Sequence, residues 1–90
     1  MIRKIHIPES LKKKLREKKK KKLPQQVIDK FYWCLDQLLK NPEYPSLRHK
    51  PVQGTKDMWE ISITMNYRCV YRKRGDEAFI LLIAKHEDVF

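Results

Sequence analysis

Hydrophobic and polar positions predict one β-strand at the start of the chain and three more in its second half. Residues 1–7 interleave isoleucines with basic residues, as in a strand, and Pro8 ends this segment. Tight connections at residues 65–66 and 74–76 separate three later strands, the last of them apolar over residues 78–84, which predicts an antiparallel meander. The first two of these strands alternate with period two: one side carries Trp59, Ile61, Ile63, Tyr67, Cys69 and Tyr71, and the other carries Glu60, Ser62, Thr64, Arg68, Val70 and Arg72.

Between the first strand and the meander, apolar spacings of three and four predict two helices. Ser10 is a candidate N-cap of the first helix, which is mostly polar with Leu11 and Leu15 on one side. Pro24 suits the first position of the second helix, where its missing amide hydrogen would have no partner anyway. An apolar stripe marks this second helix as the main one packed on the sheet: Val27, Ile28, Phe31, Cys34, Leu35, Leu38 and Leu39.

These elements predict one α+β domain over residues 1–90, in the order strand, two-helix hairpin and three-stranded antiparallel meander. The strands should form a twisted sheet of about four strands with the helices on one face. The opposite face should be open, and it carries Glu60, Ser62 and Arg68. His86 and Phe90 follow the last apolar strand and are poor core material, so they are candidates for a site at the sheet edge.

Length and composition limit the class of protein. Ninety residues, of which 41% are hydrophobic and 36% charged, suit a single small globular domain. The chain has no apolar stretch long enough to span a bilayer and no secretory signal at its start, so we expect a cytoplasmic protein that does not enter membranes. Cys34 and Cys69 lack the spacing of a zinc site or a disulfide framework. We interpret both as small core residues and expect no metal or cofactor.

The formal net charge of +10 is concentrated at one end of the chain. Residues 1–22 contain eleven lysines and arginines and only two glutamates, whereas the charges of the remaining residues almost balance. Such a basic segment would attract a polyanion and make its binding strongly dependent on salt. The alternative is a solvated helix face that keeps a small protein soluble, and for a lysine run alone both interpretations carry similar weight.

Several short motifs follow one another along the second half of the chain. They are Leu47-Arg48-His49 leading to Gly54, Trp59-Glu60-Ile61, Tyr67-Arg68-Cys69-Val70-Tyr71, an acidic turn, Ile80-Leu81-Leu82, and His86 followed by Asp88-Val89-Phe90. Together with the order of elements, they resemble the RelE/ParE toxin superfamily of toxin–antitoxin systems over nearly the whole chain. Within that superfamily, His49, His86 and Phe90 look most like the YafQ branch.

The resemblance implies a toxin that pairs with a cognate antitoxin and cleaves messenger RNA on the ribosome. This chemistry needs a base for the ribose 2′-hydroxyl, cations for the pentavalent phosphorane, an acid for the leaving 5′-oxygen and an aromatic ring for a splayed base. His86 matches the C-terminal histidine of the family and is the candidate general acid or base, because an ordinary histidine pKa of about 6.5 suits proton transfer in both directions. Its alternative role is a surface histidine at the end of the last strand.

The resemblance also implies roles for other residues. Arg68 matches a strand arginine that binds the scissile phosphate, unless it only forms an ion pair with Glu60. His49 matches a loop histidine that orients phosphate or shares proton transfer, although a water-exposed loop residue is the slightly favoured interpretation. Tyr67 or Phe90 could stack on a base, and for Tyr67 packing in the core is the better interpretation. The candidate cationic contacts to RNA are Lys85, Arg48, Lys12, Lys13, Lys18, Lys19 and Lys20.

One departure from the superfamily keeps other functions open. Where the YafQ branch has a further strand histidine and the RelE branch has lysines, this chain has Ser62, with Glu60 nearby. A carboxylate on a phosphate-binding face is unfavourable unless it acts as a base or pairs with Arg68. The alternatives are a DNA gyrase inhibitor of the ParE branch, which shows no need for these proton-transfer residues, and an inactive relative that only binds its antitoxin or RNA. The oligomeric state stays open, a monomer included.

Overall fold

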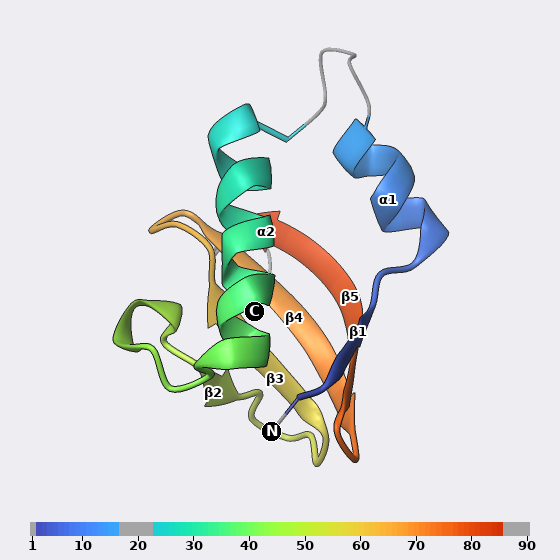
Figure 1. Cartoon of the computed structure of the whole chain (residues 1–90), viewed down its shortest axis with the longest axis vertical. Coiled ribbons are helices and arrows are strands. Elements are labelled where there is room, and N and C mark those ends of the chain that lie inside the picture. The colour runs from blue at the N-terminus through green and yellow to red at the C-terminus, as the bar shows by residue number, and fades with distance from the viewer. Residues whose placement is uncertain (1, 17–22, 86–90) are drawn as a thin grey trace.

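The computed structural model describes residues 2–16 and 23–85. Figure 1 shows the helix labelled α2 lying over the sheet. In chain order the elements are β1 (Lys4–His6), α1 (Glu9–Arg16), α2 (Gln25–Lys40), the 3₁₀ helix η1 (Pro45–Leu47), β2 (Lys50–Pro51), β3 (Met58–Ser62), β4 (Tyr67–Arg74) and β5 (Glu77–Lys85). No helix in these described ranges is long and apolar enough to cross a membrane.

The strands form one sheet in the order β1-β5-β4-β3-β2. β3, β4 and β5 pair antiparallel, as predicted for the meander, and β1 lies parallel to β5. The α+β class is therefore confirmed. The sheet has five strands where about four were predicted, because the two-residue strand β2 pairs with β3 at the edge. A register irregularity between Val70 and Tyr71 accommodates one extra residue in β5.

Both helices begin at a proline carbonyl. The backbone amides of Leu11 and Lys12 donate to the carbonyl of Pro8, at 3.0 Å each, so α1 begins before Ser10 and the prediction of Ser10 as N-cap was wrong. Pro24 was predicted as the first helical residue of α2. It is instead the N-cap, with an extended backbone, and the helix begins at Gln25. Proline fits this boundary because its fixed φ is compatible with an extended residue and its carbonyl still accepts the first helical bonds.

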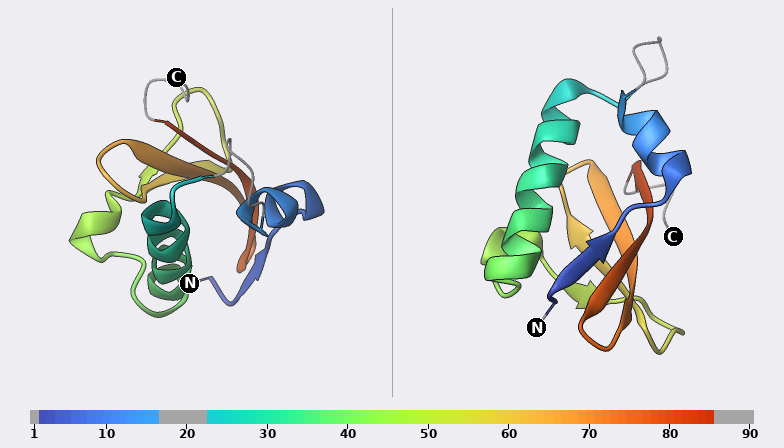
Figure 2. Two further views of the ribbon diagram at one scale, coloured as in Figure 1. Left: turned by 90° about the horizontal axis from the view of Figure 1, so that it is seen from above. Right: turned by 45° about the vertical axis from the view of Figure 1, so that its right-hand side comes forward.

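One hydrophobic core joins both helices to the sheet. Figure 2 shows α1, α2 and the strands from two further directions. Cys34 and Cys69 are fully buried in this core, which confirms their prediction as core residues, and both thiols are free. Burial raises the pKa of Cys34 to about 11 and raises that of Cys69 further, so neither thiol ionises readily. The other members include Leu11, Leu15, Val27, Ile28, Phe31, Leu35, Leu38, Ile61, Tyr71, Ile80 and Ile83.

Phe31 and Tyr32 form a matched pair for testing this core. Phe31 has no exposed surface, whereas Tyr32 is 49% exposed. Phe31→Ala should lower the free energy of unfolding by about 3–5 kcal/mol, because it removes a buried ring and leaves a cavity. Tyr32→Ala should change it by only about 0.5 kcal/mol. Urea denaturation measures both, and similar losses for the two variants would contradict the placement of α2.

Candidate functional site

Four polar side chains from three neighbouring strands meet on the sheet face opposite the helices, which we call the outer face. Lys50 in β2 is the cross-strand partner of Glu60 in β3. Ser62 in β3 is the cross-strand partner of Arg68 in β4. Because side chains alternate along a strand, all four point away from the helix-covered core. We call these four residues the polar cluster.

The Glu60 carboxylate is the centre of the polar cluster. Its Oε1 atom lies 3.4 Å from Lys50 Nζ and 3.9 Å from Arg68 Nε. Arg68 Nη1 also donates a hydrogen bond to Ser62 Oγ, and Ser62 Oγ donates one to the carbonyl of Thr64 at 3.2 Å. The ion pair between Arg68 and Glu60, one of the two roles considered for this arginine, is therefore present.

Glu60, Ser62 and Arg68 are buried, although they were predicted to lie on an open face. Glu60, Ser62 and Arg68 expose only 4%, 7% and 8% of their surfaces. Their ion pair and hydrogen bonds hold these side chains against one another. A buried carboxylate is tolerated at such a position only when cations and donors compensate its lost hydration. Lys50 differs, because 60% of its side chain is exposed, and it is the member through which the cluster meets solvent.

Sequence reasoning missed Lys50 as a site residue. It belongs to a strand of two residues at the edge of the sheet, and the neighbouring Pro51 argues against a strand. Hydrophobic periodicity therefore could not reveal it. The available signal was its position next to His49, because neighbouring residues in an extended segment point to opposite faces. Only one of these two residues can face Glu60, and the structure selects the lysine.

His49 lies on the helix side of the sheet and does not join the polar cluster. Its Nε2 accepts a hydrogen bond from the Tyr71 hydroxyl at 2.5 Å, and its Nδ1 is 3.4 Å from the carbonyl of Pro42. Its ring centroid is 5.0 Å from that of Trp59. Burial lowers the pKa of His49, and Lys73 acts in the same direction. The half-buried, neutral imidazole is a packing element here, so its prediction as a water-exposed residue was wrong.

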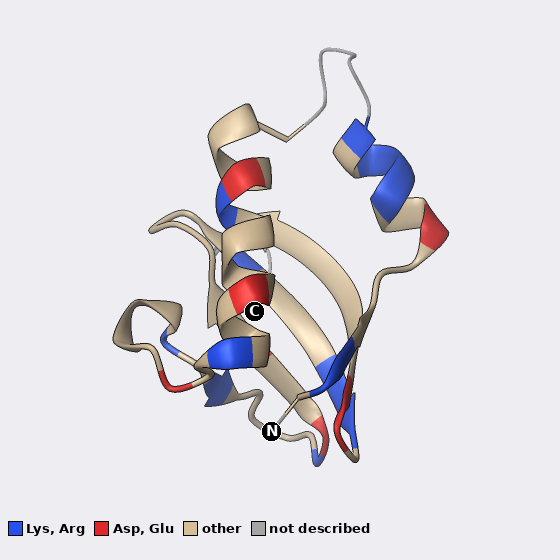
Figure 3. Ribbon diagram, viewed as in Figure 1, with Lys and Arg blue, Asp and Glu red and all other residues tan. Residues whose placement is uncertain are grey.

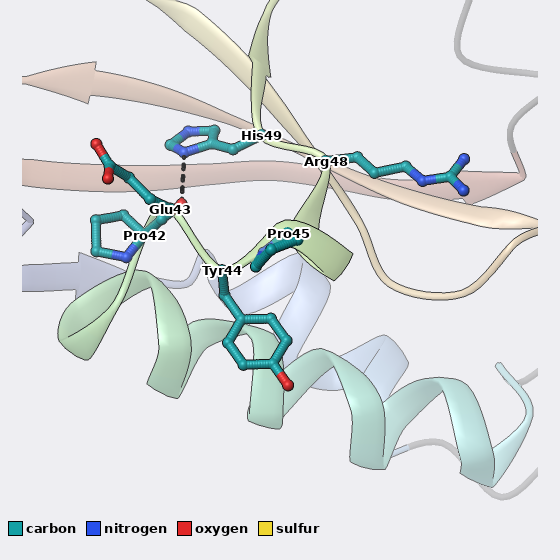
Figure 4. Close-up of a pocket in the computed structure, with 6 residues that line it drawn as sticks. All are labelled: Pro42, Glu43, Tyr44, Pro45, Arg48 and His49. Carbon is teal, nitrogen blue, oxygen red and sulfur yellow. Dashed lines mark hydrogen bonds between the residues drawn. The ribbon is translucent and has the colours of Figure 1, made fainter.

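Two hollows adjoin His49. One, of about 360 Å³, is lined by Pro42, Glu43, Tyr44, Pro45, Arg48 and His49. Figure 4 shows the Arg48 side chain extending away from the other lining residues. The second hollow, of about 270 Å³, is lined by Ile2, Pro42, Glu43, His49, Trp59, Tyr71 and Lys73. Neither hollow is lined by a residue of the polar cluster, so the hollows do not extend it.

The structure does not bring the remaining predicted residues to the polar cluster as a group. Tyr67 packs partly buried against the core, as the favoured interpretation had it, and pairs across the strands with exposed Lys85. Lys12 and Lys13 belong to α1, whose basic residues are blue in Figure 3. The predicted residues outside the described ranges are His86, Phe90, Lys18, Lys19 and Lys20. In the part of the chain that is described, no group of His, Cys, Asp and Glu could hold a metal ion.

Comparison with known proteins gives one family match and several similar structures. The model of the family described as ParE toxin of type II toxin-antitoxin system, parDE, matches residues 8–90. No curated protein sequence matches the chain. A copper-bound mutant toxin from Helicobacter pylori has a TM-score of 0.65 and 21% identity, with 100% of both chains covered.

Two further structures share the fold at lower identity. The YoeB/ParE toxin from Agrobacterium tumefaciens has a TM-score of 0.65 and 17% identity, with 92% of this chain and 98% of that chain covered. A chain of the E. coli DinJ-YafQ toxin-antitoxin complex has a TM-score of 0.65 and 16% identity, with 100% and 99% covered. At such identities the likeness concerns the fold alone.

The lowered pKa of His49 predicts a specific pH dependence of stability. Above a pH of about 6.5 the histidine is neutral in both the folded and the unfolded chain. Below it, the unfolded chain binds the proton first, so stability falls as the pH decreases towards the lowered folded pKa, by at most about 1.4 kcal/mol per pH unit. His49→Gln should remove this component. Urea denaturation at several pH values compares the two proteins, and parallel profiles would contradict the buried neutral imidazole.

Proposed function

The chain belongs to the ParE toxin family of type II toxin–antitoxin systems, and from this premise we propose that it is a toxin that cleaves messenger RNA on the ribosome. The observation that supports this proposal is the polar cluster, in which a carboxylate and a hydroxyl lie beside two cations. A carboxylate can serve as the base and the two cations can stabilise the phosphorane, which are two of the functions that cleavage at a ribose requires. Cleavage of messenger RNA would stop translation, which accounts for toxicity.

The proposed reaction is attack of a ribose 2′-oxygen on the adjacent phosphorus. A new bond forms between this oxygen and phosphorus, the bond from phosphorus to the 5′-oxygen breaks, and a cyclic phosphate remains. Arg68 and Lys50 would stabilise the negative charge on the phosphorane oxygens. Glu60 can accept the 2′-hydroxyl proton, and His86 is proposed as the acid that protonates the leaving 5′-oxygen. Phe90 is proposed to hold a neighbouring base by stacking.

The charge of the polar cluster is compatible with this role. With Glu60 ionised, the two cations leave the cluster with a net positive charge, and both lie within 4.0 Å of the carboxylate. A phosphate that approaches through exposed Lys50 would compete with Glu60 for the cations. Nearby cations favour the ionised carboxylate and so oppose its protonation. A phosphate that draws the cations away would therefore make Glu60 a better proton acceptor.

Gyrase inhibition is the second candidate function. The matching family is described by its ParE toxin, and the YafQ and YoeB structures are at most 17% identical to this chain. An inhibitor of this kind would act by binding, and its effect would survive the loss of individual proton-transfer groups. In both cases the partner is an antitoxin, since a type II system pairs a toxin with one, and a chain of the similar DinJ-YafQ structure comes from such a complex.

Single-turnover cleavage of messenger RNA on programmed ribosomes tests the proposed reaction. Arg68→Gln and Lys50→Gln should each slow cleavage by about 10²–10³-fold, the usual cost of losing one transition-state donor. His86→Ala should slow it by about 10²–10⁴-fold through the loss of an acid–base group. Lys40→Gln is the control, because Lys40 lies on α2 and pairs with Asp36. A wild-type protein that cuts nothing but blocks gyrase supercoiling would establish the second candidate.

The basic segment that includes Lys12, Lys13 and Lys18–Lys20 is proposed to dock the toxin on ribosomal RNA. Uniform lysine charge supplies attraction without positioning a proton, so these residues should affect binding and not the chemical step. Replacing Lys12, Lys13 and Lys14 together by glutamine should weaken ribosome binding and flatten its dependence on salt. The single-turnover rate at saturating toxin should stay the same. An unchanged salt dependence would favour the solvated-face interpretation.

A further inference from the structure

A second arrangement of side chains occupies the other end of the outer face, where β1 and β5 pair in parallel. The His6 ring stacks on Phe79, with ring centroids 4.4 Å apart and planes inclined by only 7°. His6 Nε2 donates a hydrogen bond to the Glu77 carboxylate at 2.6 Å. This bond holds the imidazole parallel to the phenyl ring. The two rings therefore form a pre-oriented aromatic stack on the sheet surface.

The pairing of the strands places the stack in line with a third residue, in β4. His6 pairs with Phe79, and Phe79 pairs with Arg72 in β4. β1 is the outermost strand, so the side of the His6 ring turned away from Phe79 faces the edge of the sheet, and 35% of the side chain is exposed. Arg72 lies two strands further in, about 10 Å away. Its side chain is 40% exposed, and its charged partner among the described residues is Asp57, at 3.4 Å.

We propose that His6, Phe79 and Arg72, which we call the edge platform, form a subsite for single-stranded RNA next to the cleavage site. A base would stack on the outward side of the His6 ring, and Arg72 would bind a backbone phosphate. Stacking on an aromatic ring accepts any base, and a guanidinium matches phosphate geometry. The place of this subsite in a reaction rests on the proposed nuclease function, whereas its binding of RNA does not.

The path between the two sites favours RNA as the occupant. Arg68 and Arg72 lie on the same side of β4, four residues or about 13 Å apart. An RNA strand with one phosphate at Arg68 can therefore follow β4 to reach Arg72. Near the edge platform, Lys4 and Arg74 are the cross-strand neighbours of Glu77. Around it, the cations Arg3, Lys4, Arg72 and Arg74 exceed the acids Asp57, Asp76 and Glu77 by one. A polyanion with flat bases fits this combination of rings and positive charge.

Binding of a short fluorescein-labelled oligouridylate, followed by anisotropy at several salt concentrations, tests the edge platform without any cleavage step. Phe79→Ala should weaken binding about tenfold and leave the salt dependence unchanged, because it removes the ring that holds His6 in position for stacking and removes no charge. Phe79→Trp should retain binding. Arg72→Gln should weaken binding and lower the salt slope by about one, as expected for one lost phosphate contact.

Matched controls on the helix side separate these effects from generic ones. Tyr32→Ala removes an exposed aromatic ring from α2, and Lys40→Gln removes an exposed cation from the same helix. Both should bind the oligouridylate like the wild type. Thermal melts of all variants verify folding, and the retained binding of Phe79→Trp distinguishes loss of stacking from loss of structure.

Several results would overturn the edge platform. The first is that the wild type does not bind the oligouridylate at low salt. The second is that the wild type, Phe79→Ala and Arg72→Gln bind it with equal affinity. The third is that the variants lose only antitoxin binding. The last result would assign the platform to a protein partner. The proposed nuclease function fails separately. If the wild type binds RNA through Phe79 yet cleaves nothing on ribosomes, the subsite stands without the reaction. If it cleaves while both variants bind normally, the reaction stands without the subsite.

Discussion

The alternation of side chains along β4 is the constraint on which the rest of the structure depends. β4 is the central strand of the sheet and pairs with β5 over its whole length and with β3 over residues 68–72. Cys69 and Tyr71 point into the core, while Arg68 and Arg72 point to the outer face. A slip of one residue would exchange these sets and bury two guanidinium groups among apolar side chains. Packing of Cys69 and Tyr71 in the core therefore also fixes Arg68 and Arg72 on the outer face.

The buried Glu60 carboxylate links stability to the chemistry of the outer face. Its two cationic neighbours compensate the hydration that it loses, and the loss of either leaves a buried charge with less compensation. Substitutions in the polar cluster therefore act on folding as well as on any reaction. A carboxylate alone would repel a phosphate. Two cations beside Glu60 offset this repulsion, so the carboxylate is compatible with the proposed phosphate site.

Residues that are consecutive in the sequence lie on opposite faces of the sheet. Arg48, His49 and Lys50 are consecutive, yet His49 packs against Tyr71 and Trp59 while Lys50 reaches Glu60 across the edge of the sheet. The polar cluster therefore has a lysine where the family resemblance suggested a histidine. A fold shared at low identity does not transfer such roles, because a change of one position in an extended segment moves a side chain to the opposite face.

Hydrophobic periodicity in the sequence was sufficient to determine the α+β class, both helices, the meander, the two core cysteines and the outward position of Glu60 and Arg68. These features follow from local spacing, which periods of 2 and 3.6 residues report directly. Only the tertiary structure decided the parallel pairing of β1 with β5, the strand β2, the burial of Glu60, Ser62 and Arg68, and the side on which His49 lies. Each depends on contacts between residues far apart in sequence, such as Lys50 with Glu60 or His6 with Phe79, and no local pattern records which distant partner a side chain meets.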